Sequence, residues 1–489
     1  VYVPPHGRTV GATELADRVE DTETPAKKYI TACQRDRILP LPSPFIMGNS
    51  KKLDAVGKAF TDSDLMANAA VGQSMPIEDI DLSGSRSLSD HAMAQFLEAT
   101  CSSELPLKTL RRLNISQCLQ AGRETREHIV RLAGEGGAVF LRTLDLSGVT
   151  MGVKMLLPLT QAVQAHSYLH TLRLADTGLG NAMNAKLCIE NILASQTVEV
   201  LDLGWNCFTS EVFSHLGQCL VDGKTVKTLS LANCSASSHL ISPSVYFLEH
   251  LLRDQTLVSL DVGMNRLDFR GALVIEGALS NSRKLTDLNV SHNPLGVSGM
   301  RCLLRLLCRD YSGLVNFNCD FCFSTDQAPR VQEGIQVFIF TNPAGRYKLD
   351  LVRPYHRTIL RMLYEYTEYK KLTPDATFQN IFFTPGSFSH PSGKDQNLVW
   401  PVPTSGNLEM TFSIDKVMEV VMKGTPDDRF TEVLGLYNEA MRFKPGYKKL
   451  VTLIAQWKSL EGNLLAQNMM LNALARDFIF DASHVDQLC

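Results

Sequence analysis

The nine residues VEVLDLGWN, at Val198–Asn206, decide the fold of this chain. They read apolar, two variable, apolar, variable, apolar, two variable, and a final small or polar residue. The same phrase occurs nine times, and clear copies are LVSLDVGMN (Leu257–Asn265) and LTDLNVSHN (Leu285–Asn293). Successive copies start 28 to 33 residues apart, at Ile77, Leu110, Leu141, Leu169, Val198, Val226, Leu257, Leu285 and Leu314.

Each phrase predicts a short strand. Its central Leu-x-Leu alternates like a strand of about four residues with one buried face. The ninth residue turns the chain out of the strand, and the rest of each period carries helical spacing, as at Met155, Leu156, Leu159 and Val163. One strand and one helix cannot bury their own apolar faces, so the copies must stack. Stacked copies form a parallel sheet on the inside of a horseshoe, with helices outside.

These rows resemble leucine-rich repeats of the long, ribonuclease-inhibitor-like type, over roughly half of the chain. The expected fold class is therefore α/β: a leucine-rich-repeat solenoid, followed by a small mixed, mainly helical C-terminal domain. The expected domains are residues 1–76, an N-terminal arm and capping segment, residues 77–330, the repeat domain, and residues 331–489, the C-terminal domain.

The N-terminal segment has little apolar pattern before Pro25, which can start a helix. An extended stretch at Leu39–Phe45 and a short helix at Leu53–Phe60 are expected to follow. Such a segment can cover the open end of the first repeat, because an unpaired edge strand and an exposed core end need protection. It can also extend onto a partner as a docking arm, and the two roles are compatible.

In the C-terminal domain, alternation predicts a strand at Tyr347–Val352 that pairs with a second strand at Leu408–Phe412. Pro354 is expected to start a helix. The segment Gln332–Phe340 is apolar enough to pack against the last repeat, and a series of amphipathic helices is expected over Ser413–Cys489.

Composition excludes several classes of function. The 489 residues carry a net charge of −3, with 44% hydrophobic and 20% charged residues, which suits a folded protein without nucleic-acid or anionic-membrane partners. No apolar run reaches the ~18 residues that a membrane span needs. The twelve cysteines are scattered, with Cys118, Cys234 and Cys322 at ninth positions, which indicates reduced, buried thiols in an intracellular protein.

No motif predicts catalysis or a cofactor. The pair Cys319 and Cys322 lacks the second pair that a zinc site needs, so both are expected to pack in the repeat. Gly178–Gly180 is the ordinary turn after a ninth position, and no phosphate-binding loop is present. His292 is expected at the rim of the sheet. His356 is expected on a helix surface, with contact to the last repeat as the alternative. We expect no catalytic, cofactor-binding or metal-binding residues.

The concave face is the candidate partner surface. Its central row sits at the fifth position of each phrase and is polar and mildly acidic, without aromatic residues: Asp81, Asn114, Asp145, Arg173, Asp202, Ser230, Asp261, Asn289 and Asn318. It can accept a basic helix or tail, or it can simply be solvated. Trp205 and Met264 lie at eighth positions on the rim, where they can contact a partner or pack on neighbouring loops. The candidate partner-binding residues are Asp81, Asp145, Arg173, Asp202, Trp205, Asp261 and Met264.

Three segments outside the repeats resemble flanking segments of leucine-rich-repeat proteins from motile cilia: YITACQRDRILPLPS (Tyr29–Ser43), NPAGRYKLDLVRPYHR (Asn342–Arg357) and LVWPVPTSGNLEMTF (Leu398–Phe412). The resemblance implies a non-enzymatic scaffold or adaptor that binds several proteins within a large assembly, such as a ciliary or flagellar axoneme in the cytoplasm. A mitochondrial assembly is an alternative location.

Other functions remain open at this stage. A GTPase-activating protein resembling the Ran GTPase-activating family could offer Arg112, Arg173 or Arg266, although the acidic tail typical of that family is absent. A substrate receptor for ubiquitin ligation would need an adaptor-binding motif, and none is recognised. A direct enzyme is the remaining alternative.

Overall fold

The computed structural model describes residues 24–41, 43–72, 75–101, 104–235, 241–307, 312–322, 338–340, 342–369, 372–388 and 402–414. The chain forms two compact units. The first unit holds Val1–Ala236 and Thr256–Val262, and the second holds Ser237–Gln255 and Gly263–Cys489. The predicted domain boundaries at residues 76 and 330 stay predictions.

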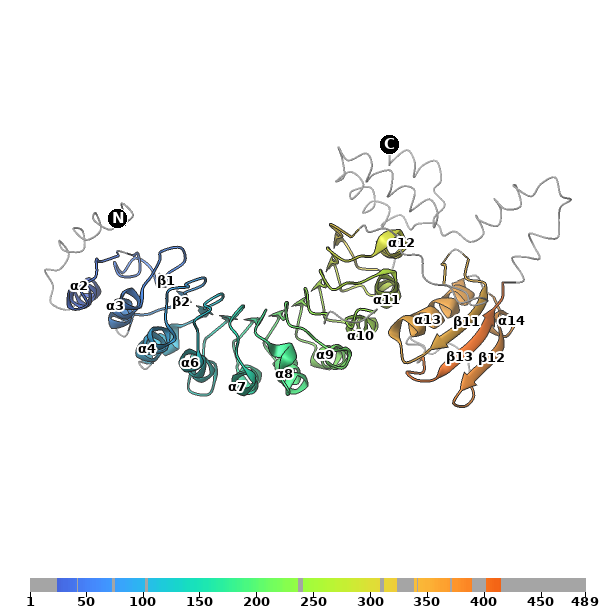
Figure 1. Cartoon of the computed structure of the whole chain (residues 1–489), viewed down its shortest axis with the longest axis horizontal. Coiled ribbons are helices and arrows are strands. Elements are labelled where there is room, and N and C mark those ends of the chain that lie inside the picture. Colours follow the sequence, from blue (N-terminus) through green and yellow to red (C-terminus); the bar gives the residue numbers. More distant parts are fainter. Residues whose placement is uncertain are drawn as a thin grey trace, which may run out of the picture. The chain divides into compact units, whose positions relative to one another are not determined.

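Ten short strands follow one another in chain order in a single parallel sheet, as the repeat pattern predicts (Figure 1). The strands are β1 (Lys52–Asp54), β2 (Asp79–Asp81), β3 (Arg112–Asn114), β4 (Thr143–Asp145), β5 (Thr171–Arg173), β6 (Val200–Asp202), β7 (Thr228–Ser230), β8 (Ser259–Asp261), β9 (Asp287–Asn289) and β10 (Asn316–Asn318). The solenoid is therefore confirmed.

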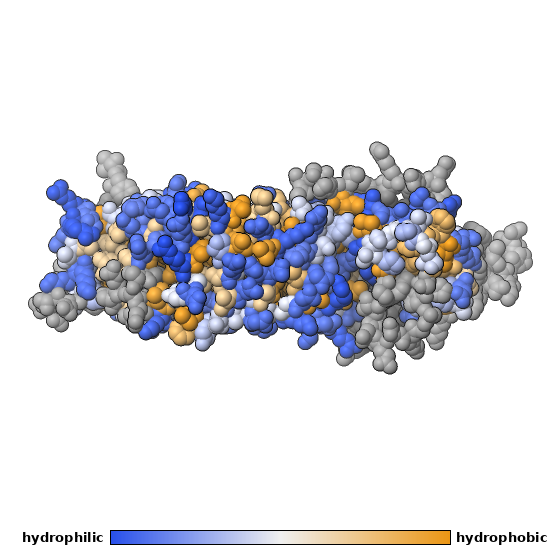
Figure 2. Space-filling model, turned by 90° about the horizontal axis from the view of Figure 1, so that it is seen from below, coloured by the Kyte–Doolittle hydropathy of each residue, from blue (hydrophilic) through white to orange (hydrophobic). Residues whose placement is uncertain are grey.

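Helices separate the strands. In the first unit they are α2 (Pro25–Arg35), α3 (Asp62–Gly72), α4 (Asp90–Cys101), α5 (Glu104–Thr109), α6 (Arg123–Ala133), α7 (Val153–Ala165), η1 (Leu179–Asn181), α8 (Ala185–Leu193) and α9 (Ser210–Gly223). In the second unit the repeats carry α10 (Val245–Leu248), η2 (Glu249–Leu252), α11 (Phe269–Leu279) and α12 (Gly296–Leu307). Figure 2 shows the surface on the helix side, where hydrophilic residues predominate and hydrophobic ones lie between them.

The strand leucines share one interior. Neighbouring strands pair through the fourth residue of each phrase, and these residues are all buried: Leu144, Leu172, Leu201, Leu229 and Leu260. Burying a leucine side chain contributes about 1.5–3 kcal/mol relative to leaving it exposed. The burial of this row of leucines between neighbouring strands therefore explains why the repeats must stack.

The sheet begins one copy earlier than the sequence pattern indicates. The short helix expected at Leu53–Phe60 is wrong, because Lys52–Asp54 forms β1 and pairs with β2 in parallel. This copy escapes the pattern because its first position holds the polar Ser50 instead of an apolar residue. Its eighth residue, Gly57, has φ of +68°, and its fourth, Leu53, is buried, so it otherwise behaves as a repeat.

The eighth residue of every phrase adopts left-handed backbone geometry. This conformation turns the chain from the strand toward the next helix, and it holds for glycine and non-glycine residues alike. The residues are Gly57, Gly84, Gln117, Gly148, Asp176, Trp205, Asn233, Met264, His292 and Phe321. A bulky side chain in this region costs of order 1–3 kcal/mol, so the sequence keeps large residues there at some expense.

The ninth residue satisfies backbone groups inside the turns. Asn206 Nδ2 donates to the carbonyls of Leu174 and Leu203 at 2.8 and 3.0 Å, and its Oδ1 accepts from the Leu179 amide at 3.0 Å. Cysteine can do only part of this: Cys234 Sγ donates to the Leu203 carbonyl at 3.1 Å. A buried backbone group without a partner is costly, so Asn206 and Cys234 each bind their repeat to the one before it.

Replacing Asn206 by alanine is expected to destabilise the first unit by roughly 1–3 kcal/mol for each backbone group left without a partner. Asn206→Cys should cost less, because a thiol can still donate to one carbonyl while offering a poor acceptor to the Leu179 amide. Urea unfolding followed by circular dichroism measures the stability of both variants. Equal losses of stability in Asn206→Ala and Asn206→Cys would contradict the bonding role of Asn206.

The second unit also contains an antiparallel sheet of three strands in the order β11-β13-β12. Strand β11 (Gly345–Asp350) pairs with β13 (Asn407–Phe412), as predicted, with Tyr347 opposite Met410. Strand β12 (Phe378–Thr384), preceded by α14 (Pro374–Thr377), was not predicted, because its sequence FQNIFFT has three consecutive apolar residues and does not alternate. Its register with β13 shifts between Gln379 and Phe382. The helices expected after residue 414 lie outside the described residues.

Helix α13 (Pro354–Tyr369) begins at Pro354 as predicted and lies against α11. Gly277 permits this close packing, because a Cβ there would sit 2.6 Å from Thr358 Cγ2. Phe269 and Tyr355 add an edge-to-face ring contact with centroids 6.0 Å apart. These contacts fix α13 to the repeat helices of the second unit.

Candidate functional site

The acidic row on the strand face has a structural function that the sequence pattern does not reveal. In seven copies, the fifth residue is Asp or Asn and its Oδ1 accepts the backbone N–H two residues later at 2.9 to 3.2 Å. Such a side-chain bond imitates a backbone turn and ends the strand. The residues are Asp54, Asp81, Asn114, Asp145, Asp202, Asn289 and Asn318.

The candidate partner-binding residues of this row differ in how far their side chains are exposed to solvent. Asp81 and Asp145 are buried, whereas Asp202 and Asp261 are half-buried. A partner that reaches this face meets carboxylates already engaged with their own turns. Their role in partner binding stays a prediction.

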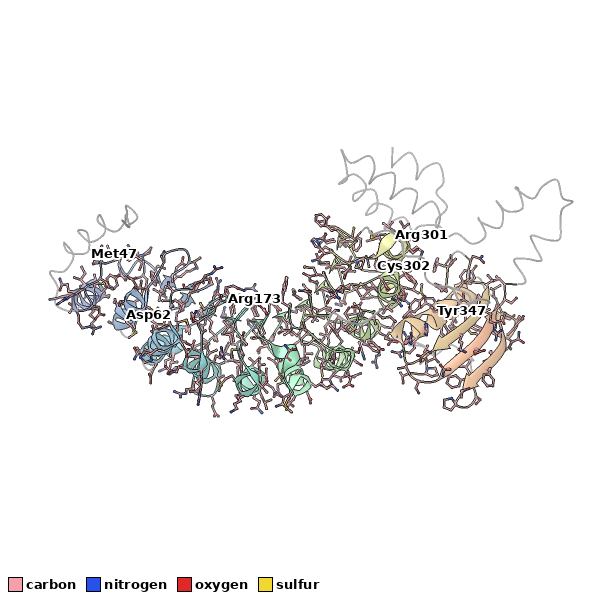
Figure 3. All side chains as sticks on the ribbon, viewed as in Figure 1. Met47, Asp62, Arg173, Arg301, Cys302 and Tyr347 are labelled. Carbon is pink, nitrogen blue, oxygen red and sulfur yellow. The ribbon has the colours of Figure 1, made fainter. Side chains whose placement is uncertain are left out.

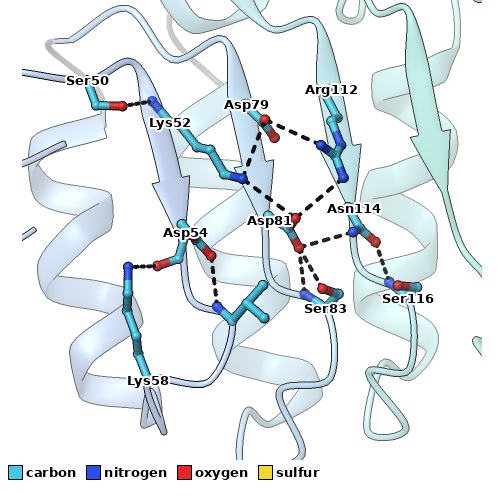
Figure 4. Close-up of polar contacts among 11 residues, drawn as sticks. Ser50, Lys52, Asp54, Lys58, Asp79, Asp81, Ser83, Arg112, Asn114 and Ser116 are labelled. Atoms are coloured by element: carbon cyan, nitrogen blue, oxygen red, sulfur yellow. Dashed lines mark hydrogen bonds and ion pairs between the residues drawn. The ribbon is translucent and has the colours of Figure 1, made fainter. Parts of the chain in front are cut away.

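Charges on the first three strands are also paired (Figure 4). Arg112 lies 3.5 Å from Asp81 and 3.8 Å from Asp79, and Lys52 approaches the same two carboxylates at 4.0 and 3.9 Å. Asn114 Nδ2 donates to Asp81 Oδ1 at 3.1 Å. Burial raises the pKa of Asp79, and the charges of Arg112 and Lys52 only partly oppose it. On these three strands, the acidic charges of Asp79 and Asp81 are therefore balanced by basic side chains of the same face.

Arg173 takes the fifth position where most copies have Asp or Asn (Figure 3). Its guanidinium lies 3.5 Å from Asp145 and is about half exposed. Of the three arginines considered for GTPase activation, Arg112 and Arg173 are in ion pairs, and Arg266 is exposed. None of these observations favours that activity.

The rim of the sheet carries exposed apolar side chains at eighth positions. In the first unit Trp205 is 54% exposed, so about half of it is open to solvent. In the second unit Met264 is 41% and Phe321 79% exposed. His292 is exposed, as predicted, and stacks on Phe321 with ring centroids 4.7 Å apart. Sequence analysis selected Trp205 and Met264 but overlooked Phe321, which occupies the same eighth position.

The residues considered for chemistry are engaged in structure. Cys322 Sγ donates to the Val290 carbonyl at 3.0 Å, and burial raises the pKa of Cys319 to about 12, so both thiols stay protonated at neutral pH. His356 lies in the first turn of α13 and is half-buried, because its Nδ1 accepts the Asp350 amide at the end of β11 at 2.9 Å. Burial lowers its pKa.

No group of three or more His, Cys, Asp or Glu side chains in the described ranges could hold a metal ion. Among the helices that the structure describes, none is both long and apolar enough to cross a membrane.

Comparison with known proteins agrees with the repeat architecture. A family model described as a leucine-rich repeat matches residues 194–211 and 281–304. No curated protein matches the chain.

Several solved structures are similar to the chain. The leucine-rich repeat-containing protein LegL7 from Legionella pneumophila is 15% identical, over 54% of this chain and 88% of that one, with a TM-score of 0.37. Actin-binding site 2 of leiomodin-1 is 23% identical, over 29% of this chain and 80% of that one, with a TM-score of 0.24. A chain in the structure of the yeast Rad7 and Elc1 complex is 13% identical, over 67% of this chain and 97% of that one, with a TM-score of 0.26.

The recurring phrase, the parallel sheet with a helix after nearly every strand and the matching family model lead to one conclusion. The described repeats fold as a leucine-rich-repeat solenoid.

Proposed function

We propose that this protein is a non-enzymatic scaffold that holds protein partners within a large assembly, and that the assembly is a ciliary or flagellar axoneme complex. Repeat solenoids present long, rigid surfaces, and their function depends on the partners that bind there. A helix in nearly every period supports repeats of the ribonuclease-inhibitor-like type. The likeness of Asn342–Arg357 to segments of ciliary repeat proteins supports the location.

The observation that carries the proposal is the exposed rim of the second unit, formed by Met264, His292 and Phe321. These residues follow strands β8, β9 and β10 at the same position of consecutive phrases. Each has left-handed φ, which glycine adopts without strain at Gly84 and Gly148. Keeping Met, His and Phe there exposes apolar surface and strains the backbone, and the stacking of His292 on Phe321 leaves most of the Phe321 side chain exposed. Contact with a partner gives these side chains a function.

Because glycine fits the eighth position, the variant Met264→Gly/Phe321→Gly separates binding from folding. The stability of this variant is expected to stay within about 1 kcal/mol of the wild type. Glycine relieves the backbone strain of the folded state, and this gain offsets the larger backbone entropy that glycine gives the unfolded state. We expect the tagged wild-type chain, expressed in ciliated cells, to be recovered in isolated axonemes with stable protein partners, and the variant to lose those partners. Met183→Ser changes an exposed methionine elsewhere and is the control.

Recovery of the wild-type chain only as a free monomer would overturn the scaffold function. Stable partners recovered from the cytosol, with none in axonemes, would overturn the axonemal location alone. Partner recovery unchanged in the double glycine variant would exclude the rim as the contact surface.

A further inference from the structure

The second residue of each phrase forms a continuous row along the edge where the strands of the first unit begin. The backbone N–H of each residue donates to the carbonyl of the one before it, at 2.7 to 3.0 Å, so the row follows the strand spacing of about 4.8 Å. In chain order the row reads Lys51, Glu78, Arg111, Arg142, His170, Glu199, Lys227 and Val258.

Two ion pairs flank the middle of this row, and the charges of Arg111 and His170 also act on the neighbouring Glu78 and Glu199. Lys51 binds Glu78 and Lys227 binds Glu199, each at 2.7 Å. Between them lie three consecutive basic residues, Arg111, Arg142 and His170, which we call the basic edge; all three are exposed. Within the described ranges, the Arg142 side chain forms no ion pair or hydrogen bond. Like charges on neighbouring strands destabilise a sheet, so folding does not account for this arrangement.

An exposed pair of rings adjoins the basic edge. Phe140 and Tyr168, which we call the aromatic pair, immediately precede the first residues of the β4 and β5 phrases. Their centroids are 5.2 Å apart, and they are 37% and 40% exposed. Aromatic side chains with accessible faces are frequent anchors at protein interfaces.

His166 holds this edge in place before any partner arrives. Its Nε2 donates to the Ala138 carbonyl at 3.1 Å, and its Nδ1 accepts the Tyr168 amide at 3.2 Å. Burial lowers the pKa of His166, which favours the neutral ring that this bonding requires. His170 Nδ1 donates to the Thr197 carbonyl at 3.0 Å, which fixes the third basic side chain. A preformed site avoids part of the entropy cost of binding.

We propose that the basic edge and the aromatic pair together bind a short acidic segment of a partner protein that carries an aliphatic or aromatic side chain beside its carboxylates. This inference rests on the proposed scaffold function and names the chemistry of one partner. Carboxylates pair with Arg111 and Arg142, because a guanidinium donates two parallel hydrogen bonds to a carboxylate. The apolar side chain covers Phe140 and Tyr168 and removes them from water.

The charge pattern favours an acidic peptide over a nucleic acid. The basic edge is three strands wide and ends at Glu78 on one side and Glu199 on the other. A phosphate backbone extending past either end would meet a carboxylate, and the whole chain carries a net charge of −3. Nucleic-acid binding relies on neutralising many phosphates along a track, which this edge does not provide.

The test uses the full chain and three fluorescent probes: a peptide with several glutamates followed by leucine and tryptophan, the same peptide with both apolar residues replaced by serine, and a single-stranded oligonucleotide. Fluorescence anisotropy should show saturable binding of the first peptide that weakens as salt is added. The serine peptide should bind at least tenfold more weakly, and the oligonucleotide weakest of all.

Charge reversal at the basic edge, Arg142→Glu, should weaken binding of the first peptide at least tenfold. Lys154→Glu makes the same charge change at an exposed site on α7 and should leave binding unchanged. Phe140→Ser should reduce binding of the first peptide to the level of the serine peptide. Circular dichroism confirms that each variant folds.

Absence of saturable peptide binding, equal weakening by Arg142→Glu and Lys154→Glu, or tighter binding of the oligonucleotide would each overturn the inference. The scaffold function is judged separately by recovery of partners from cells. If partners are recovered and the peptide does not bind, this inference fails and the scaffold function stands.

Discussion

Replacing Arg305 by methionine is expected to destabilise the repeats of the second unit by about 3–5 kcal/mol, because it leaves a buried carboxylate without its partner. Glu276 on α11 and Arg305 on α12 are both buried. The guanidinium Nε and Nη2 donate to the two carboxylate oxygens at 2.8 and 2.7 Å. The same guanidinium lies 4.2 Å from the ring centroid of Phe340. Phe340 thus packs on α12. It ends the segment Gln332–Phe340, which was expected to pack against the last repeat and of which residues 332–337 lie outside the described residues.

Urea unfolding and hydrogen exchange over residues 269–307 measure this loss. The double variant Glu276→Met/Arg305→Met removes both charges and should recover most or all of the stability, because apolar residues often replace a buried ion pair without cost. Arg123→Met, which breaks an exposed pair with Glu127 on α6, is the control and should leave exchange in the second unit unchanged. If the double variant were as unstable as the single one, the isolated charge would not be the cause.

Replacing Glu249 by alanine is expected to loosen α13 from the repeat helices, again by about 3–5 kcal/mol. Glu249 in η2 binds two arginines one helical turn apart on α13: Arg357 Nε donates at 2.8 Å and Arg361 Nη2 at 2.7 Å. Arg357 also donates to the Leu351 carbonyl. Without the carboxylate, two largely buried guanidinium groups would face each other. Hydrogen exchange over residues 354–369 should increase.

The same contact predicts a dependence on pH. Burial alone would raise the pKa of Glu249, but the hydrogen bonds and charges of Arg357 and Arg361 outweigh it, so the pKa is lowered. An unfolded glutamate titrates near pH ~4.3, so the stability from this contact is present above that pH and is lost as the pH falls through the lower folded pKa. Urea unfolding of the wild type should therefore become easier below about pH 4.

Two variants isolate this effect. Glu249→Gln should lack the Glu249 contribution to the acid-induced loss, because it has no carboxylate to protonate. Glu409→Gln removes a half-buried carboxylate of β13 that pairs with Arg346 and Lys348 of β11, and α13 should stay protected in this variant. A Glu249→Gln profile that follows the wild type at low pH would show that another group controls the acid response.

Much of the fold could be predicted from local pattern. The apolar spacing in nine phrases placed strands β2 to β10. The fourth and sixth positions are buried in the phrases of β2 to β9, and in the last phrase Phe317 and Cys319 are half-buried. Alternation at Tyr347–Val352 and Leu408–Phe412 predicted the pairing of β11 with β13, and Pro354 marked the start of α13. These signals work because strand alternation and proline geometry are local properties of the chain.

The candidate site was less accessible to sequence analysis. The pattern correctly placed Trp205 and Met264 on the exposed rim, because eighth positions lie outside the buried set. It also placed Asp81 and Asp145 on the open face, whereas both are buried and bind their own turns. Spacing indicates on which side of a strand a residue lies, but it does not indicate whether an oxygen bonds to solvent or to the next amide.

The sequence by itself determined the repeat, its period and the alternation of strand and helix, because burial of apolar side chains follows directly from their spacing. Only the tertiary structure decided which charges meet. Glu249 and Arg357 lie 108 residues apart, and Glu276 and Arg305 lie 29 apart on different helices. Their contact depends on how helices pack, since the strength of an ion pair depends on distance and burial, which no local pattern specifies.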